Sequence, residues 1–401
     1  MHVCLITSGR PSEVYGGEEK FTILLRNWLT EHGQYVTIIG RKLFGVEVIE
    51  SEDSSGIELN MKETHSRTLP IPYPMYMVCM LITSLLFTLH VILIHRKSRI
   101  SIIHAQDTGY GGLSAIIAAK ILGVPVIISS HGVRHSTLTK TLKDNPMSSF
   151  LLLFEHWLDI VTSKHADLAI VVASSHKHVF ANLGIQEAKI KAIPIGINVD
   201  NFKSDEEVRK AVRRELNVQN GILLGFVGRF SMEKNLLTLL ESFVQALKYA
   251  NKMKLVLIGT GPIENRLRTL CHVRGIDDKV IFTGIRYDID RLLSAIDIFL
   301  LPSYEEGCPT ALLEAMASGK AIVSSNIASV QDIVKHGEEA LLVDPNSAKE
   351  LKEAILLLYN RLDLRVKLGN KAKEKAKFYD VDEVCKRVLT IYEELIQRNR
   401  D

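Results

Sequence analysis

The chain has 401 residues, 46% of them hydrophobic and 24% charged, which is typical of a packed globular protein. This length exceeds one ordinary hydrophobic core and suits two domains of about 200 residues each. The net charge of +3, from 49 basic and 46 acidic residues, excludes the chain-wide basic field that nucleic-acid binding would require.

Short apolar runs alternate with helical patterns in the first half, which is typical of βαβ units and a parallel sheet. The N-terminal run turns polar by Ser8 and is too short for a signal-peptide core, so we expect a buried strand. A helical pattern from Glu18 to about His32 ends at Gly33, a residue that suits a helix end. The strands expected in this half cover residues 2–7, 35–39, 101–105, 126–130, 168–172 and 190–193.

Residues 73–94 contain no Asp, Glu, Lys or Arg, and the basic residues Arg96, Lys97 and Arg99 follow them. The segment is long enough to cross a bilayer, but one crossing would separate strands that should share a sheet. It could instead be buried in its domain, contact another subunit or lie at a membrane interface. A helix that covers a sheet needs only one apolar stripe, whereas this segment is apolar nearly all round. We therefore expect residues 73–95 to make a peripheral contact with a membrane or partner.

The pattern breaks near residues 194–198, where a polar and acidic stretch begins, and alternation then resumes. We therefore expect one domain over residues 1–197 and a second over residues 198–380, both Rossmann-like and doubly wound, in the α/β class. A helical tail is expected from about residue 364 to 398. The strands expected in the second half cover residues 222–228, 254–259, 279–283, 296–301, 320–324 and 340–343.

Two cations follow the first strand of the second half. Ligands of open parallel sheets bind at the carboxyl ends of the strands, where Arg229 lies, and Lys234 precedes a helix that starts near Asn235. Arg binds phosphate oxygens bidentately, Lys adds a point charge and helix amides favour anions. The pair predicts a diphosphate site, and the alternative is two exposed loop cations.

The most informative stretch, residues 302–319, follows an apolar strand. Pro309 suits the first turn of a helix and Gly319 its end. Glu314 is the only charge in this helix, and its neighbours at helical spacing, such as Thr310, are small or polar. Since carboxylates accept hydrogen bonds from sugar and ribose hydroxyls, a hydroxyl-rich ligand is indicated. The alternative is a water-facing stripe on a buried helix.

The spacing Glu306-x7-Glu314, within P-S-x-x-E-G-x5-L-E-A-M-A, resembles the signature of glycosyltransferase family 4, the retaining, GT-B-type group 1 glycosyltransferases. Arg229 and Lys234 match the family's diphosphate-binding pair. Further matches are Gly16-Gly17-Glu18, His131-Gly132, Pro194-Ile195-Gly196-Ile197-Asn198 and Gly259-Thr260-Gly261-Pro262.

This resemblance implies a GT-B fold, in which a cleft separates the two Rossmann-like domains. Residues 1–197 would form the acceptor-side domain, residues 198–380 the sugar-nucleotide-binding domain, and residues 381–401 a helix that packs back on the N-terminal domain.

The resemblance also implies roles for single residues. Arg229 and Lys234 would stabilise the charge on the departing nucleoside diphosphate. Glu306 would bind hydroxyls of the transferred sugar, His131 would lie near that sugar, and Glu314 would hold the ribose. Further donor contacts are expected at Gly16, Gly17, Gly228, Gly261, Arg286, Gly307, Cys308 and Thr310.

The activity so implied is retaining transfer of a sugar, of hexosyltransferase type, from a nucleotide-sugar donor. The donor is a substrate, so no resident cofactor is expected. We expect a lipid-linked or membrane-surface acceptor. The alternatives are a soluble enzyme acting on a small sugar, sugar phosphate or polysaccharide, and a non-catalytic sugar-nucleotide-binding subunit.

Two departures leave the donor sugar open. Cys308-Pro309 stands where many members have Phe-Gly, and Gln106 stands where a second His is common after His104. Both departures bear on the identity of the donor sugar more than on the reaction class.

Asp288-Ile289-Asp290 spells the D-x-D metal motif of the other main glycosyltransferase fold. Here it opens a helix, where Asp is favoured as a cap, so we expect no metal site. Five widely spaced cysteines, none in C-x-x-C spacing, indicate a reducing compartment. We therefore expect a cytoplasmic protein, peripheral at the inner face of the cell membrane.

Overall fold

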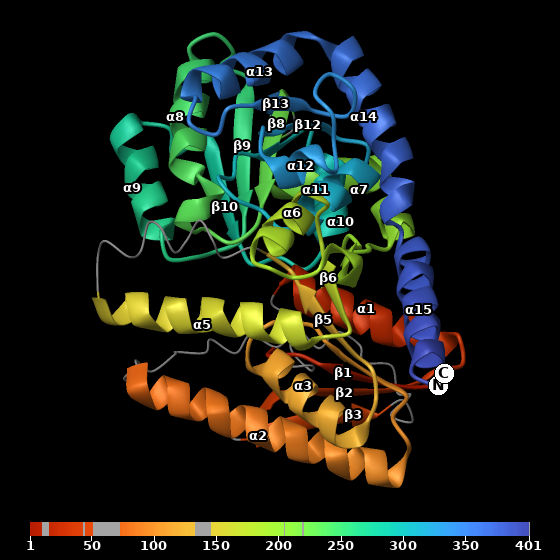
Figure 1. Cartoon of the computed structure of the whole chain (residues 1–401). Helices are drawn as coiled ribbons and strands as arrows, with labels where there is room; N and C mark the ends of the chain where they lie inside the picture. The colour runs from red at the N-terminus through yellow and green to blue at the C-terminus, as the bar shows by residue number, and fades with distance from the viewer. Residues whose placement is uncertain are drawn as a thin grey trace. The chain divides into compact units, whose positions relative to one another are not determined.

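The computed structural model describes residues 1–9, 16–42, 45–50, 73–132, 146–203, 205–218 and 220–400. The chain divides into two compact units, residues 1–196 with 381–401 and residues 197–380 (Figure 1). Each unit is built on one predominantly parallel sheet with helices packed against it, which confirms the predicted α/β class with two doubly wound domains.

The sheet of the first unit has the strand order β3-β2-β1-β4-β5-β6-β7. Neighbouring strands run parallel except β2 and β3, which are antiparallel. The strands are β1 His2–Ile6, β2 Tyr35–Lys42, β3 Gly45–Glu50, β4 Ile102–Ala105, β5 Val126–Ser130, β6 Leu168–Val171 and β7 Ile190–Ala192. The helices are α1 Gly17–Glu31, α2 Tyr73–Lys97, α3 Tyr110–Leu122, α5 Pro146–His165, α6 Ser175–Asn182, the 3-10 turn η1 Glu187–Lys189 and α15 Val381–Arg398.

Alternation along β4 assigns its side chains to two different layers. Ile103 and Ala105 join a core with Phe87 and Val91 of α2. His104 lies between them and belongs to the opposite face, where its Nδ1 is 2.5 Å from the hydroxyl of Tyr392 in α15. The last helix of the chain therefore packs within the first unit, where it also contacts α1.

The sheet of the second unit is parallel, in the order β10-β9-β8-β11-β12-β13. Its strands are β8 Ile222–Val227, β9 Met253–Ile258, β10 Val280–Gly284, β11 Ile298–Leu301, β12 Ala321–Ser325 and β13 Leu341–Val343. The helices are α7 Glu206–Glu215, α8 Leu236–Leu247, α9 Glu264–Arg274, α10 Ile289–Ala295, α11 Thr310–Ala317, α12 Ala328–Gln331, α13 Ala348–Asn360 and α14 Leu362–Ala376. Three 3-10 turns complete the described part of the unit: η2 Val199–Phe202, η3 Met232–Lys234 and η4 Lys377–Tyr379.

The expected helical tail consists of two helices, and the resemblance implied a separate second helix over residues 381–401. Helix α14 ends at Ala376, and α15 starts at Val381 after the turn η4. The break coincides with hydrogen bonds to a distant segment: Ile197 N donates to Tyr379 O at 2.9 Å, and Val199 N donates to Asp380 Oδ2 at 3.3 Å. The turn that separates α14 from α15 is therefore held by contacts with residues 197 and 199, which the spacing of apolar residues along the helices does not reveal.

Candidate functional site

The two predicted cations lie at the carboxyl edge of the second unit's sheet. Strand β8 ends at Val227, and the exposed Arg229 follows it directly. Within the described part of the chain, the Arg229 guanidinium has no ion pair or hydrogen bond. Lys234 closes the turn η3, immediately before α8. A cationic group free to receive an anion therefore stands at the edge where ligands of such sheets bind.

Lys234 is already paired with a carboxylate. Its Nζ lies 2.8 and 2.9 Å from the two carboxylate oxygens of Glu306, whose side chain is 6% exposed. Ser303 Oγ donates to the same carboxylate at 2.6 Å. The structure thus brings together two predicted site residues from segments 72 positions apart, and Ser303 fixes the carboxylate of one of them.

Asn235 joins the loops of this edge, a role that the sequence analysis missed. It is buried in the left-handed conformation, with φ +57°, at the start of α8. Its side-chain amide donates to the carbonyl oxygens of Pro302, at 3.1 Å, and Pro345, at 2.7 Å. The loops after β8, β11 and β13 are therefore held by one side chain next to Lys234. An Asn at a helix start, one of the few residue types that adopt positive φ, was the available signal.

Gly261 has a packing role in addition to the predicted donor contact. A Cβ atom at this position would lie 2.3 Å from the carbonyl oxygen of Phe230. Phe230 N donates to Thr260 O at 2.8 Å, so the loop after β9 lies directly on the loop after β8. Gly228 and Gly259 have φ of +152° and +132°, conformations that L side chains rarely adopt. These glycines permit two backbones to meet at the strand ends.

Glu314 lies in α11 and is 4% exposed, which excludes the alternative of a water-facing stripe. Cys308 is also buried, whereas Gly307 and Thr310 are half-buried at the start of the helix. The segment from Glu306 to Glu314 thus runs from the carboxyl edge of the sheet into a buried helix.

Arg286, at which a donor contact is expected, is bound by carboxylates of its own unit. Its guanidinium donates to Asp288 at 2.8 and 2.7 Å and to Glu215 at 2.6 Å. These hydrogen bonds raise the pKa of Arg286, and the bond from Arg286 lowers the pKa of Asp288. Asp288 therefore occupies the predicted cap position of α10, but its side chain binds Arg286 rather than a backbone amide.

No group of three or more His, Cys, Asp or Glu side chains suited to a metal ion occurs within the described ranges. Asp288, the first residue of the D-x-D motif, is engaged by Arg286 and by Arg291 at 3.6 Å. Its carboxylate is therefore neutralised by protein cations.

A polar cluster lies at the carboxyl edge of the first unit's sheet. The ring nitrogens of His104 are both used, since Nδ1 faces Tyr392 and Nε2 lies 2.7 Å from Ser129 Oγ. By contrast, both buried ring nitrogens of His131 lack a hydrogen-bond partner among the described residues, as do both amide atoms of the fully buried Gln106. Burial lowers the pKa of His131 to about 4, so its imidazole is neutral near pH 7. Gln106 and His131 therefore offer unused donors and acceptors.

Gly16 and Gly17 lie at the N-terminus of α1, in the first unit. Gly16 is the exposed N-cap residue and supplies no capping side chain, and Gly17 opens the helix. The first turn carries Glu18 and Glu19. A Cβ atom at Gly16 would lie 2.9 Å from Glu19 Oε2, so the Glu19 side chain folds back over the start of its own helix.

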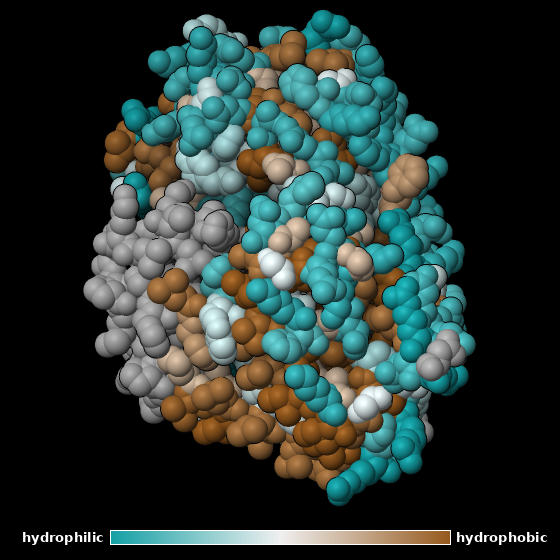
Figure 2. Space-filling model, viewed as in Figure 1, coloured by the Kyte–Doolittle hydropathy of each residue, from teal (hydrophilic) through white to brown (hydrophobic). Residues whose placement is uncertain are grey.

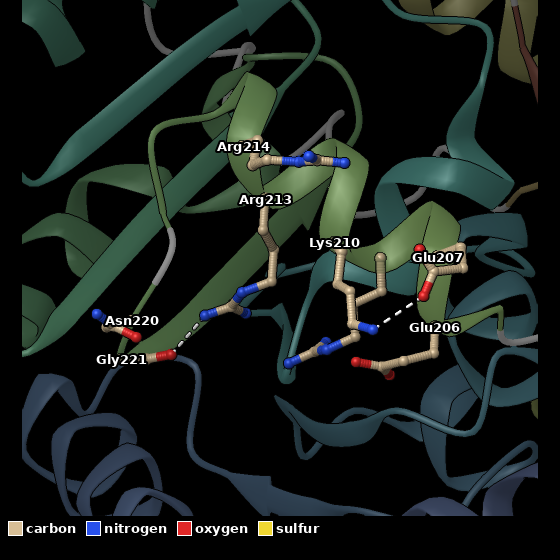
Figure 3. Close-up of a pocket in the computed structure, with 8 residues that line it drawn as sticks. Glu206, Glu207, Lys210, Arg213, Arg214, Asn220 and Gly221 are labelled. Carbon is tan, nitrogen blue, oxygen red and sulfur yellow. Dashed lines mark hydrogen bonds and ion pairs between the residues drawn. The ribbon is translucent and has the colours of Figure 1, made fainter.

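A pocket of about 530 Å³ lies elsewhere in the second unit, at the amino edge of its sheet (Figure 3). Arg213 of α7 donates there to Gly221 O at 2.6 Å (Figure 3). Arg213 also donates to Asp297 Oδ2 at 3.0 Å, and Arg209 donates to Asp297 Oδ1 at 2.6 Å. These arginines fasten α7 to the start of β11. Because both guanidinium groups are already bound to Asp297 and ligands of such sheets bind at the opposite edge, we assign this pocket a structural role.

Family models match most of the chain. The model of glycosyl transferases group 1 matches residues 208–375, and that of glycosyltransferase family 4 matches residues 15–201. The chain is 32% identical over 239 residues to the N,N'-diacetylbacillosaminyl-diphospho-undecaprenol alpha-1,3-N-acetylgalactosaminyltransferase of Campylobacter jejuni, covering 58% of this chain and 62% of that relative. It is 28% identical to the UDP-Gal:alpha-D-GlcNAc-diphosphoundecaprenol alpha-1,3-galactosyltransferase of Escherichia coli, covering 65% of this chain and 67% of that relative.

A solved structure with the same fold is HepE of Anabaena in complex with UDP. The TM-score is 0.73, the sequence identity is 18%, and the match covers 98% of this chain and 99% of HepE.

Proposed function

Because this chain belongs to the group 1 glycosyltransferases of glycosyltransferase family 4, we propose that it is a retaining, metal-independent transferase of hexosyl type. Its two Rossmann-like units form the architecture of GT-B glycosyltransferases. In this proposal the donor is a nucleotide sugar, with UDP as the first nucleotide to test, and the acceptor is a lipid-linked sugar at the cytoplasmic face of the membrane.

The observation that carries the proposal is the contact between Lys234 and Glu306 at the sheet edge that also carries Arg229, which has no ionic partner among the described residues. A diphosphate brings negative charge to Arg229 and competes with Glu306 for the Lys234 ammonium. Release from Lys234 frees the Glu306 carboxylate to accept hydrogen bonds from sugar hydroxyls. One exchange of partners then couples binding of the phosphates to binding of the sugar.

The chemistry proposed for the site is stabilisation of a departing anion. As the glycosidic bond to the diphosphate breaks, negative charge grows on the leaving oxygen, and Arg229 with Lys234 offsets it. Retention follows if the acceptor hydroxyl attacks the same face of the sugar and gives its proton to the departing phosphate. No protein nucleophile is required on this route.

The first unit offers groups suited to hydroxyls at the carboxyl edge of its sheet. Gln106 supplies an amide that can both donate and accept, and the neutral His131 supplies one donor and one acceptor. Both residues follow parallel strands, where ligands of such sheets bind. We assign these groups to the sugar being transferred or to the acceptor.

A lipid-linked acceptor is favoured by two relatives, whose names specify sugars carried on diphospho-undecaprenol. An acceptor of this kind lies at a membrane, and none of the five cysteines, all within the described residues, forms a disulfide, as suits a reducing compartment. Both observations favour a site of action at the inner face of the cell membrane.

The proposal is tested by incubating the purified protein with UDP-galactose or UDP-N-acetylgalactosamine and a sugar linked through diphosphate to a short polyprenol. We expect a lipid product extended by one sugar, formed equally well in EDTA. Transfer to free sugars or polysaccharide instead of the lipid would favour a soluble enzyme. UDP binding without transfer or donor hydrolysis would favour a non-catalytic subunit.

A further inference from the structure

Helix α2 buries one stripe of its surface within the first unit. Met80, Ser84, Phe87, Val91 and Ile94 recur at helical spacing and are all buried. Phe87, Val91 and Ile94 belong to the core that covers one face of the sheet. Helix α2 also packs against α3, β2 and β3. This stripe fixes α2 to its own unit.

The opposite surface of α2 exposes large aliphatic side chains at the same helical spacing. Seven of them are between 38% and 64% exposed: Val78, Leu81, Ile82, Leu85, Leu86, Leu89 and Leu93. Figure 2 shows brown residues gathered over α2 at the foot of the view. Soluble monomers rarely expose so continuous an apolar surface unless it serves as a binding face.

Basic residues stand at one end of this exposed face. Arg96, Lys97 and Arg99 are exposed at and just beyond the C-terminus of α2, and Lys120 is exposed at the end of α3. Helix α2 itself contains no acidic residue. An apolar face with a cationic edge matches the acyl layer and anionic headgroups of a lipid surface.

We propose that α2 lies flat on an anionic membrane, with the seven aliphatic side chains in the headgroup–acyl boundary and Arg96 and Arg99 on phosphate headgroups. By length and composition α2 could cross a membrane. Crossing would pull Phe87 and Val91 out of the core and separate α2 from the sheet, so the helix docks without spanning. Docking through α2 explains how the enzyme reaches a lipid acceptor. Only this explanation rests on the proposed function; the binding of α2 to a membrane does not.

A lipid surface fits this face better than a second copy of the chain does. Cores of protein interfaces are enriched in aromatic side chains, Met and Arg. The seven exposed residues of α2 are Leu, Ile and Val throughout. These side chains suit acyl chains, which demand neither hydrogen bonds nor shape complementarity.

The test is co-sedimentation of the full chain with vesicles of phosphatidylglycerol and phosphatidylethanolamine, without donor or acceptor. We expect binding that weakens in high salt and on neutral phosphatidylcholine vesicles. Leu85→Ser with Leu89→Ser should lower the partition coefficient about tenfold or more, because both side chains would lose apolar burial. Arg96→Gln with Arg99→Gln should lower it about fivefold per charge.

The matched control is Val273→Ser with Leu362→Ser, two exposed apolar positions of the second unit, which should bind vesicles like the parent. Circular dichroism and UDP binding check that every variant is folded. A folded parent that stays in the supernatant overturns the proposal, as does a dimer that Leu85→Ser with Leu89→Ser splits. Resistance to extraction by alkaline carbonate would indicate spanning and also overturns it. Because no sugar is transferred in this assay, its failure would leave the proposed catalytic function untouched.

Discussion

Lys234 and Arg229 have the same proposed role but different surroundings. The Lys234 ammonium neutralises Glu306, whose side chain is nearly buried, whereas the Arg229 guanidinium is exposed and has no partner among the described residues. Removing one member of a buried ion pair leaves the other charge uncompensated, which destabilises a protein more than the pair itself stabilises it. The two cations should therefore respond differently to substitution.

We predict that Arg229→Met and Lys234→Met both lower the rate of transfer, by about 10²–10³-fold. Lys234→Met should also lower the free energy of unfolding by about 1–3 kcal/mol, because the Glu306 carboxylate is left without its cation. Arg229→Met should change it by less than about 0.5 kcal/mol. Initial rates and urea unfolding of both variants measure the two effects.

The double variant Lys234→Met with Glu306→Gln provides the control. An amide at position 306 removes the stranded charge, so most of the stability should return while activity stays low. Equal loss of stability in the single and double variants would contradict the ion-pair account.

His131 and His104 should make stability depend on pH. Burial lowers the pKa of His131 to about 4 and that of His104 to about 3, and His104 is lowered further by the neighbouring His131. In the unfolded chain both return to about 6.5. Between these values the unfolded state binds more protons, so the stabilisation is complete above about pH 6.5 and is lost as the pH falls toward 4.

We predict that the free energy of unfolding falls on acidification from pH 6.5 to 4.5, with up to about 1.4 kcal/mol per pH unit from each of these histidines. His131→Asn should remove the contribution of one histidine, so the slope should fall by up to about 1.4 kcal/mol per pH unit. Urea unfolding at several pH values measures it. A slope identical in the parent and the variant would mean that His131 takes up its proton freely in the folded state.

At the scale of elements, the β8–α8 connection positions the site. Asn235 adopts a positive φ, and its side-chain amide donates hydrogen bonds to the carbonyl oxygens of Pro302 and Pro345. It therefore aligns the loops after β8, β11 and β13 next to Lys234. Tyr304 N donates to Glu233 O at 2.8 Å and ties the loops after β8 and β11 a second time. The distance between Lys234 and Glu306 therefore depends on this connection.

We predict that Asn235→Ala lowers the free energy of unfolding by about 2–4 kcal/mol, through two lost hydrogen bonds and a strained left-handed alanine. Asn235→Gly keeps the backbone conformation and should cost about 1–2 kcal/mol. Both should reduce kcat/KM, since Lys234 and Glu306 lose their fixed separation. Unfolding and steady-state kinetics check these outcomes.

Asn217 is the matched control, because it is exposed with φ +53° and lies outside the site. Asn217→Ala should cost only the strain of about 1 kcal/mol and leave kcat/KM unchanged. If Asn235→Ala behaved like Asn217→Ala, the connection would have no positioning role.

Most elements could be predicted from the sequence because buried parallel strands are continuous apolar runs. The strand β3 escaped prediction, and it pairs antiparallel at the edge of its sheet. Its alternation of apolar and polar residues covers only Val46-Glu47-Val48 before the apolar Ile49 follows directly, a pattern too short to separate from a loop. The helical pattern of residues 364–398 did not reveal the break between α14 and α15, because the break depends on bonds to residues 197 and 199; only the resemblance implied a separate helix over residues 381–401.

At the scale of the whole molecule, the order of strands and helices was enough to predict the position of the candidate site. It was not enough to predict the contacts between the side chains of that site. The carboxyl edges of both sheets carry the predicted residues because parallel strands deliver their following loops to one edge. The pairing of Lys234 with Glu306 and the engagement of Arg286 by Asp288 and Glu215 join loops and helices whose approach only the fold determines.

The function proposed for this chain is retaining transfer to a lipid-linked acceptor without a metal. It is tested most directly by the anomeric configuration of the product, measured by proton NMR after reaction of an α-configured UDP-sugar with a polyprenyl-diphosphate-linked sugar in EDTA. We predict an α-linked product, formed at the rate seen without EDTA. A β-linked product, or turnover that returns only when magnesium or manganese is added, would contradict it.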